Sequence, residues 1–277
     1  MKKIGIVNRG EPALRFLNAL DGLKREEKNA PTSVALFTEA DRNSIYVQSA
    51  EEAVCIGSDR TAYLDAEIVL KALVDSECDA AWLGWGFASE DGEFAQALED
   101  GGIVLLAPRP ETMTALGDKI KAKQMAEANQ VPVAPWAIVD SGEDALQHAH
   151  RIGFPLLLKA AGGGGGRGIR LVDHPDELAS SFVSARDEAA RSFRSSGVFM
   201  EKFVRSARHI EVQVVGDGEG KVSIFGVRDC SLQRRRQKVI EECQAPNMDP
   251  KALQGLKDAS RRLTEACLLY TSPSPRD

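Results

Sequence analysis

The sequence has no apolar stretch that approaches the length of a transmembrane helix. The apolar run in residues 1–8 is too short for a secretory signal peptide. Basic residues are in the minority, because 35 lysines and arginines stand against 41 aspartates and glutamates, which gives a net charge of −6. We therefore expect a cytoplasmic protein with no membrane-spanning segment and no general affinity for nucleic acid.

The cysteines also lack the spacing of a metal site. There are five of them, Cys55, Cys78, Cys230, Cys243 and Cys267, and no two form a Cys-x-x-Cys pair. This pattern excludes a zinc knuckle, and we expect no metal ligands within the chain. An odd number of cysteines without a secretory leader predicts reduced thiols in the cytosol.

Two common nucleotide-binding motifs are missing as well. A Walker loop places Lys and Ser or Thr directly after its last glycine, and no such segment occurs. The dinucleotide motif needs three spaced glycines after the first strand, whereas residues 4–7 lead into Asn8-Arg9-Gly10-Glu11-Pro12. The chain is therefore neither a P-loop protein nor a typical dinucleotide-binding protein.

The sequence does contain a different glycine-rich loop. Lys159 closes an apolar run and is followed, after two alanines, by five consecutive glycines at 162–166. Backbone without Cβ atoms can approach a polyphosphate closely and turn several N–H groups toward it. A flexible linker is the alternative, but a linker would join polar segments, and this loop joins the strand-like runs 154–158 and 169–172. A glycine-rich hairpin of this kind is typical of the nucleotide flap of ATP-grasp ligases.

The pattern of apolar segments predicts an α/β protein with two domains. Strand patterns at 4–7, 33–38, 53–56, 79–84 and 103–106 alternate with helical patterns after Pro12 and at 65–76 and 89–100. This alternation predicts a Rossmann-like, parallel-sheet domain over residues 1–117. A boundary lies between Gly117 and Pro135, around a helix at 119–129.

The order of elements changes after this boundary. Strands are expected at 136–139, 198–203, 209–215 and 221–227, with helices at 143–152 and after Glu177. We interpret residues 118–266 as an incomplete ATP-grasp fold. In the third of these strands, His209, Glu211 and Gln213 point the same way, so they can meet a ligand. An exposed sheet face would produce the same pattern, and both interpretations stay open.

Several motifs together resemble the N-terminal part of biotin carboxylase, the ATP-grasp component of biotin-dependent carboxylases. The resemblance runs from Lys3 to about Ala266. Besides Lys159 and its glycine loop, the motifs are Asn8-Arg9-Gly10-Glu11, Gly84-Trp85-Gly86-Phe87-Ala88-Ser89-Glu90, Gly117-Asp118-Lys119, Met200-Glu201-Lys202, Arg208-His209-Ile210-Glu211-Val212-Gln213, Arg228-Asp229-Cys230-Ser231-Leu232-Gln233-Arg234-Arg235 and Gln237-Lys238-Val239-Ile240-Glu241-Glu242. The form Trp82-Leu83-Gly84-Trp85-Gly86 resembles large acyl-CoA carboxylases, which predicts a multidomain parent of the acetyl- or propionyl-CoA type.

The resemblance implies a role for each matching residue. Lys119 and Lys159 would neutralise the ATP phosphates, and Gly165 and Gly166 would close over them. Adenine would be bound through the backbone of a hinge that consists of Glu201, Lys202, Phe203 and Val204. The ribose and phosphates would be bordered by His209 and Gln233.

The resemblance also implies the reaction and its partners. Lys238 would be the catalytic residue, holding bicarbonate against the γ-phosphate while carboxyphosphate forms, although it could instead belong to a basic surface run. Carboxyphosphate would then release CO2 to biotin on a carrier domain. A carboxyltransferase domain or subunit would use the product, and a homodimer is possible because dimers are common in the family.

Two departures from the family pattern affect these expectations. Arg236 stands where many members have histidine, so it keeps the charge but not the shape of a nucleotide contact. The glutamates that carry Mg²⁺, a general-base glutamate and an active-site arginine would all follow residue 266. Residues 267–277 do not resemble the family, and we interpret them as a non-native tail. We therefore expect this chain to be inactive alone.

Two other functions remain open at this stage. A different ATP-grasp ligase, such as one like carbamoyl phosphate synthetase, would share the glycine loop, although residues 234–238 argue against it. A non-catalytic nucleotide-binding module is the other alternative, because the expected metal ligands are missing from the sequence.

Overall fold

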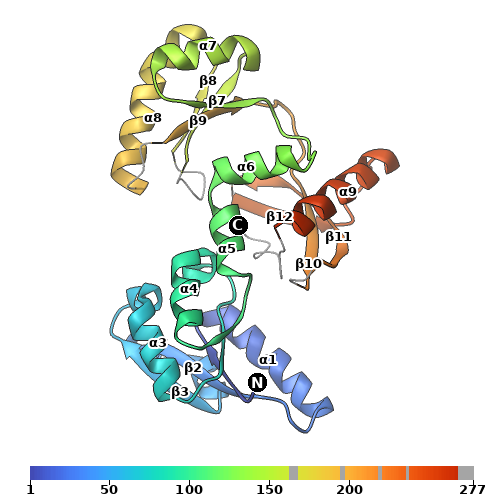
Figure 1. The fold of residues 1–277 in the computed structure, drawn as a ribbon. Helices are drawn as coiled ribbons and strands as arrows, with labels where there is room; N and C mark the ends of the chain where they lie inside the picture. The colour runs from blue at the N-terminus through green and yellow to red at the C-terminus, as the bar shows by residue number, and fades with distance from the viewer. Residues whose placement is uncertain (162–167, 194–196, 218–219, 235–236, 268–277) are drawn as a thin grey trace. The chain divides into compact units, whose positions relative to one another are not determined.

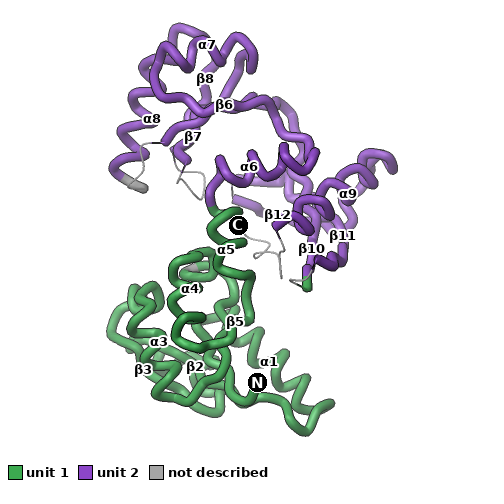
Figure 2. The backbone as a smooth tube through the Cα atoms, in the orientation of Figure 1, with its two compact units in different colours: residues 1–117, 217–219, 269–277 green, residues 118–216, 220–268 purple. Residues whose placement is uncertain are grey.

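The computed structural model describes residues 1–161, 168–193, 197–217, 220–234 and 237–267 (Figure 1). The chain forms two compact units (Figure 2). The first is built on Met1–Gly117, and the second on Asp118–Gly216 together with the segment that starts at Gly220.

The first unit contains a five-stranded parallel sheet with the strand order β3-β2-β1-β4-β5. Its strands are β1 (Lys3–Ile6), β2 (Thr32–Thr38), β3 (Glu52–Gly57), β4 (Ala80–Trp82) and β5 (Val104–Leu106). Its helices are α1 (Gly10–Glu26), α2 (Ile45–Ser49), α3 (Ala66–Asp75), α4 (Gly92–Asp100) and α5 (Pro110–Gly117), with 3-10 turns at Glu39–Asp41, Arg60–Leu64 and Phe87–Glu90. Strands β2 and β3 extend the sheet on one side of β1, and β4 and β5 extend it on the other side. All neighbouring strands are parallel, so the predicted parallel α/β class is confirmed.

The sheet of the first unit is buried on both faces, and β2 shows why. Val34 and Leu36 pack into the core formed with α3 and α4. Ala35 and Phe37 point the opposite way and pack into the core formed with α1 and α2. Successive side chains of a strand alternate between faces, so a strand buried on both sides is continuously apolar.

The second unit begins with α6 (Lys119–Ala128) and contains an antiparallel sheet with the order β6-β9-β7-β8. These strands are β6 (Trp136–Val139), β7 (Leu156–Ala160), β8 (Ile169–Val172) and β9 (Val198–Lys202). Helices α7 (Gly142–Ile152) and α8 (Leu178–Phe193), the latter after a 3-10 turn at Pro175–Glu177, pack on one face. Leu156, Leu158 and Met200 are fully buried there. The alternating residues therefore lie on the other face, among them Lys159 and Glu201.

A second antiparallel sheet of this unit has the order β10-β11-β12. Its strands are β10 (Ile210–Gly216), β11 (Val222–Arg234) and β12 (Gln237–Cys243). Helix α9 (Pro250–Ala266) packs against β10 and β11 and also contacts α6. Within the described part of the chain, every helix is too short or too polar to cross a bilayer.

Candidate nucleotide-binding site

A group of three lysines and one glutamate lies on the face of the first antiparallel sheet of the second unit that α7 and α8 leave uncovered. In the pairing of β7 with β9, Leu157 is opposite Glu201 and Lys159 is opposite Phe199. Lys159 and Glu201 are therefore diagonal neighbours on one face, within reach of each other. The other two lysines, Lys119 and Lys123, come from α6. We call Lys119, Lys123, Lys159 and Glu201 the lysine cluster.

Helix α6 places its lysines through a defined N-terminus. The Oδ1 atom of Asp118 accepts the N–H groups of Ile120 at 2.8 Å and Lys121 at 3.1 Å. A capping carboxylate fixes the first turn of a helix, and Lys119 is the first residue of that turn. Lys123 follows four residues later, on the same side of the helix.

Glu201 connects two of the lysines. Its Oε2 atom lies 2.8 Å from Nζ of Lys123, and its Oε1 atom accepts a hydrogen bond from Nζ of Lys159. The Glu201 side chain is only 13% exposed. Burial alone would raise the pKa of this carboxyl group, but the hydrogen bonds from Lys123 and Lys159 outweigh it and keep the pKa below its ordinary value.

Lys119 is linked to the cluster through the charge of Lys159. Burial lowers the pKa of its ammonium group, and the positive charge of Lys159 lowers it further. Both effects disfavour a second cation at this position. A bound anion would relieve them, and a polyphosphate has enough charge to interact with both lysines. The structure thus brings together Lys119 and Lys159, the two lysines predicted to contact phosphate.

Sequence reasoning missed Lys123. Its side chain is 18% exposed, and its ammonium group lies 5.7 Å from the centre of the Trp136 ring. The spacing of Lys119 and Lys123 was a usable signal, because residues four apart share a helix face. Nothing in the sequence pattern, however, pairs Lys123 with the distant Glu201.

The predicted adenine hinge already uses part of its backbone. The N–H of Lys202 donates to the carbonyl of Pro135 at 2.9 Å, and that of Phe203 donates to the carbonyl of Pro155 at 3.1 Å. The Val204 side chain is exposed, and its N–H has no partner among the described residues. Adenine at this hinge would therefore need carbonyl oxygens or the Val204 N–H.

The base of the glycine hairpin is held by two contacts. The N–H of Ala160 donates to the carbonyl of Gly168 at 3.1 Å, which joins the two sides of the hairpin. The N–H of Gly168 then donates to Oε1 of Glu188 at 3.2 Å. Gly165 and Gly166, for which we predict a role over the phosphates, lie outside the described residues, as do Arg236 and most of the tail.

A second charged cluster surrounds Glu211 on the sheet β10-β11-β12. Nζ of Lys238 lies 2.5 Å from Oε1 of Glu211, and Nη2 of Arg228 lies 2.5 Å from Oε2. Arg228 also pairs with Glu241, and Nε2 of His209 lies 2.9 Å from Glu211. Burial would raise the pKa of Glu211, but the hydrogen bonds from Lys238 and His209 and the positive charges of Lys238 and Arg228 lower it. Lys238, at 12% exposure, is thus a largely buried ion-paired residue rather than part of a solvated basic surface.

The remaining predicted residues lie at the edge of this second cluster. His209 comes just before β10, and its side chain is 49% exposed. The Nε2 atom of Gln233 donates to the carbonyl of Cys230 at 3.0 Å. Gln213 is half-buried in β10. Of the three polar residues expected to meet a ligand, His209 and Glu211 contact each other.

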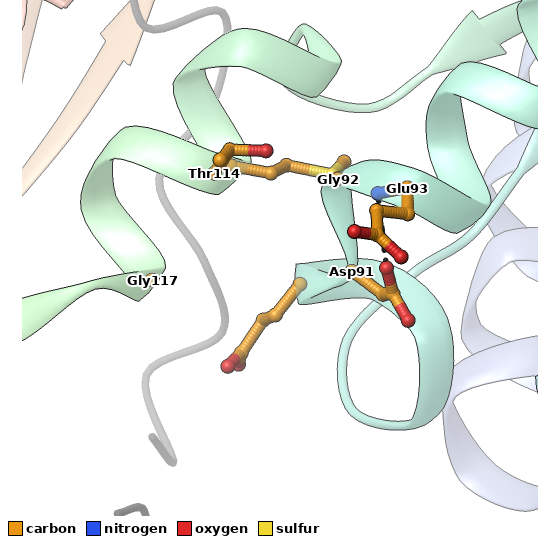
Figure 3. Close-up of a pocket in the computed structure, with 7 residues that line it drawn as sticks. Asp91, Gly92, Glu93, Thr114 and Gly117 are labelled. Carbon is orange, nitrogen blue, oxygen red and sulfur yellow. Dashed lines mark hydrogen bonds between the residues drawn. The ribbon is translucent and has the colours of Figure 1, made fainter. Parts of the chain in front are cut away.

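The first unit contains an open pocket of different character. Its volume is about 470 Å³, and it is lined by Glu90, Asp91, Gly92, Glu93, Met113, Thr114 and Gly117 (Figure 3). The Asp91 carboxylate caps α4. Three carboxylates would repel a phosphate, so this pocket does not suit a nucleotide. Among the residues that the structure describes, no group of three or more His, Cys, Asp or Glu side chains is arranged to hold a metal ion.

Two family models match the chain. One is described as the N-terminal domain of biotin carboxylase and matches residues 1–113. The other is described as the ATP binding domain of the carbamoyl-phosphate synthase L chain and matches residues 118–272. The first match covers the Rossmann-like unit, and the second covers the part that contains both charged clusters.

Known proteins agree with these matches. The biotin carboxylase of Nostoc sp. is 41% identical over 251 residues, which cover 89% of this chain and 55% of the relative. The crystal structure of a biotin carboxylase–β,γ-ATP complex from Campylobacter jejuni matches with a TM-score of 0.91 at 37% identity, over 97% of this chain and 60% of the other.

A further solved structure is the biotin carboxylase domain dimer of the Hydrogenobacter thermophilus 2-oxoglutarate carboxylase, in complex with MgADP, ADP and bicarbonate. It matches with a TM-score of 0.88 at 34% identity, over 97% of this chain and 59% of the other. The chain thus spans a little over half the length of these biotin carboxylases. Sequence, domain models and fold agree, and the chain belongs to the biotin carboxylase family.

Proposed function

We propose that the protein to which this chain belongs carboxylates biotin, with ATP and bicarbonate as the other substrates. The observation that carries the proposal is the lysine cluster, in which Lys123 and Lys159 share the carboxylate of Glu201 and the charge of Lys159 acts on a third, partly desolvated ammonium group, that of Lys119. A site with more buried cations than anions is stabilised by an anionic ligand. The glycine-rich segment that follows Lys159 in the sequence and the family of the chain support the triphosphate of ATP as that ligand.

The chain's own residues would act by positioning and by charge. Lys119 and Lys159 would hold the phosphates. Lys238 would hold bicarbonate so that one of its oxygens attacks the γ-phosphorus, which forms carboxyphosphate and releases ADP. A fixed cation at this point stabilises the negative charge that gathers on the transferring group. Carboxyphosphate would then break into CO2 and phosphate, the phosphate would take the proton from the reacting nitrogen of biotin, and that nitrogen would form a bond to CO2.

For Lys238 to act in this way, its ammonium group must be shared between Glu211 and bicarbonate. The pair with Glu211 holds Lys238 in place at 12% exposure, so little rotamer entropy is lost when substrate binds. His209, which is predicted to border the ribose and phosphates, also contacts the carboxylate of Glu211. We propose Glu201, Lys202, Phe203 and Val204 as the adenine hinge, with contacts limited to the backbone groups that remain available.

The family uses Mg²⁺, and the described residues do not fit it. Magnesium binds through carboxylates, and the best-placed candidates are already paired: Glu201 with Lys123 and Lys159, and Glu211 with Lys238 and Arg228. No step proposed for these residues therefore involves the metal. We propose that its ligands belong to a part of the protein outside the described residues.

We further propose that the protein to which this chain belongs is an acyl-CoA carboxylase of the acetyl- or propionyl-CoA type, and that the chain is from its biotin carboxylase part. The Trp-Leu-Gly-Trp-Gly form at residues 82–86 supports this assignment. Its partners would be a biotin carboxyl carrier domain and a carboxyltransferase domain or subunit, and the parent would be a cytoplasmic homodimer. The dimeric Hydrogenobacter domain and the five free cysteine thiols are consistent with these proposals.

The first test uses the 277-residue chain itself. We expect it to bind ATP in a calorimetric titration and to show little or no bicarbonate-dependent ATP hydrolysis, because the described residues do not fit Mg²⁺. Rapid carboxylation of free biotin by this chain would contradict the expected inactivity. A chain that folds and does not bind ATP would contradict the nucleotide site.

The second test uses the full-length protein that the gene encodes. Biotin should increase its bicarbonate-dependent ATP turnover, which neither a carbamoyl phosphate synthetase-like enzyme nor a non-catalytic module would show. Lys238→Met should lower kcat about 100-fold to 1000-fold and change the KM for ATP little. Lys251→Met, at the exposed start of α9, is the matched control and should leave both constants unchanged. An unchanged kcat for Lys238→Met would rule out its catalytic role.

A further inference from the structure

Lys123 has a contact that the proposed reaction leaves unexplained. Its Nζ atom lies 2.8 Å from Oε2 of Glu201, while Lys159 occupies the other oxygen, Oε1. Both side chains are largely buried, at 18% and 13% exposure. Glu201 therefore has two cationic partners, and only one of them, Lys159, is proposed to contact phosphate.

The position of Lys123 is fixed from several directions. Its ammonium group lies over the ring of Trp136, which is 9% exposed and donates its indole N–H to Glu127 at 2.8 Å. Helix α6 is capped at its start by Asp118. Arg262 of α9 donates to the carbonyls at its end, at 3.1 and 2.9 Å. A cation held in this way stays in place when its neighbour moves.

Lys159 faces two competing partners. In the structure it is hydrogen-bonded to Glu201. If it turned fully to a phosphate and Glu201 had no other partner, a buried carboxylate would be left uncompensated, which is strongly unfavourable. The second ion pair removes that penalty, because Lys123 keeps Glu201 neutralised.

We propose that Lys123 is a positioning residue for the nucleotide: it holds the charge of Glu201 and so releases Lys159 to bind a phosphate of ATP. This inference rests on the proposed nucleotide site. It assigns no contact between Lys123 and the nucleotide. Lys123 affects ATP binding only through its ion pair with Glu201. The proposal therefore differs from one in which the positive charge of Lys123 attracts the nucleotide directly.

The test is a calorimetric titration of the 277-residue chain and its variants with ATP in the presence of Mg²⁺. We expect Lys123→Met to weaken ATP binding about tenfold, because part of the Lys159–phosphate interaction is lost to Glu201. Lys121→Met, on the exposed side of the same helix, is the matched control and should bind like the wild type. Lys123→Arg keeps the charge and should stay within about threefold of the wild type.

The decisive variant is the double substitution Lys123→Met with Glu201→Gln. Once the carboxylate is gone, Lys159 has no competing partner, so ATP affinity should return to within about threefold of Glu201→Gln alone. A role of Lys123 in packing would leave the double variant as weak as Lys123→Met. A role in attracting ATP at long range would leave it about tenfold weaker than Glu201→Gln alone, because those two variants still differ by the charge of Lys123.

Each outcome distinguishes the inference from the proposed function. Equal affinity of Lys123→Met and Lys121→Met, or failure of the Glu201 substitution to restore binding, overturns the inference and leaves the nucleotide site in place. Absence of ATP binding by the folded wild-type chain overturns both. If Lys123→Met does not fold, Glu201→Gln alone still decides, since the inference predicts equal or tighter binding and a tenfold loss contradicts it.

Discussion

The two units differ in how their buried polar and charged groups are paired. In the first unit, Arg9 donates two hydrogen bonds of 2.5 Å to Asp41, which is 5% exposed. Asn8, at 1% exposure, donates to the carbonyls of Leu83 and Trp85 and accepts from the N–H of Arg9. Each of these groups is satisfied by the protein itself.

In the second unit, the lysine cluster is not balanced in this way. Lys123 and Lys159 share the carboxylate of Glu201, and the charge of Lys159 also lowers the pKa of Lys119, while Asp118 adds one more negative charge where it caps α6. Among these five side chains, three positive charges stand against two negative ones. Matched charges maintain a fold, whereas surplus buried charge indicates a ligand of the opposite sign.

The largest expected effect comes from removing that surplus. The double variant Lys119→Met and Lys159→Met should bind ATP about 100-fold to 1000-fold more weakly, because two charge-assisted contacts with phosphate are lost. Its free energy of unfolding should change by less than about 1 kcal/mol, since Lys123 still pairs with Glu201 and a repulsion is relieved. Calorimetric titration and urea denaturation measure the two quantities. A large loss of stability with unchanged ATP affinity would show that these lysines maintain the fold and do not bind the nucleotide.

The matched pair of the first unit should show the opposite behaviour. Asp41→Asn should lower the free energy of unfolding by about 2 kcal/mol, because it leaves the Arg9 guanidinium without its charged partner. ATP affinity should not change. Asp75→Asn is the control, since its partner Lys71 is exposed and the loss should stay below about 0.5 kcal/mol. Equal effects of the two substitutions in urea denaturation would show that the burial of Asp41 is unimportant.

The polar contacts of Asn8 can be tested through two neighbouring glycines. Gly84 and Gly86 both have positive φ, of 67° and 70°. A Cβ on Gly84 would lie 2.8 Å from Nδ2 of Asn8 and 2.8 Å from the Trp82 ring, whereas a Cβ on Gly86 would meet no atom within 4 Å. We expect Gly84→Ala to cost about 2 kcal/mol and Gly86→Ala about 1 kcal/mol, which is the backbone strain alone. Equal losses would mean that Asn8 and Trp82 give way easily.

The smallest expected effect is a pH dependence at a matched pair of the second unit. Hydrogen bonds from Ser231 and Arg208 lower the pKa of Asp229 to about 2. A lowered pKa in the folded state stabilises the protein above the unfolded value near 4, and this stabilisation is lost as the pH falls toward 2. Asp229→Asn should therefore be less stable than the wild type at pH 7, and the difference should shrink below about pH 4. A difference that stays constant from pH 7 to pH 3 in urea denaturation would contradict this assignment.

Much of the fold could be predicted because its strands are apolar on buried faces. The strand expected at 33–38 agrees with β2 to within one residue, since both of its faces are covered. The strand expected at 79–84 is shorter, Ala80–Trp82, because Gly84 takes a left-handed conformation. Strand β12 has mostly exposed residues and no apolar period, so its pattern gave no signal. Helix α9 was missed even though Asp249 and Pro250 provide a cap and a favourable first residue.

The site was harder to predict than the fold. Family motifs indicated Lys119, Lys159 and Lys238 as single residues with single roles. They did not indicate that Glu201 joins Lys159 to Lys123, or that Glu211 joins Lys238 to Arg228, because these contacts connect segments that only the folded chain brings together. The balance of charge, and hence the argument for an anionic ligand, depends on those contacts.

The most direct test of the central claim is a crystal structure of this chain with ATP bound. The account predicts triphosphate oxygens within about 3.2 Å of Nζ of both Lys119 and Lys159, with Lys123 still paired to Glu201. A structure with the triphosphate away from both lysines, and Lys159 still bound to Glu201, would contradict it.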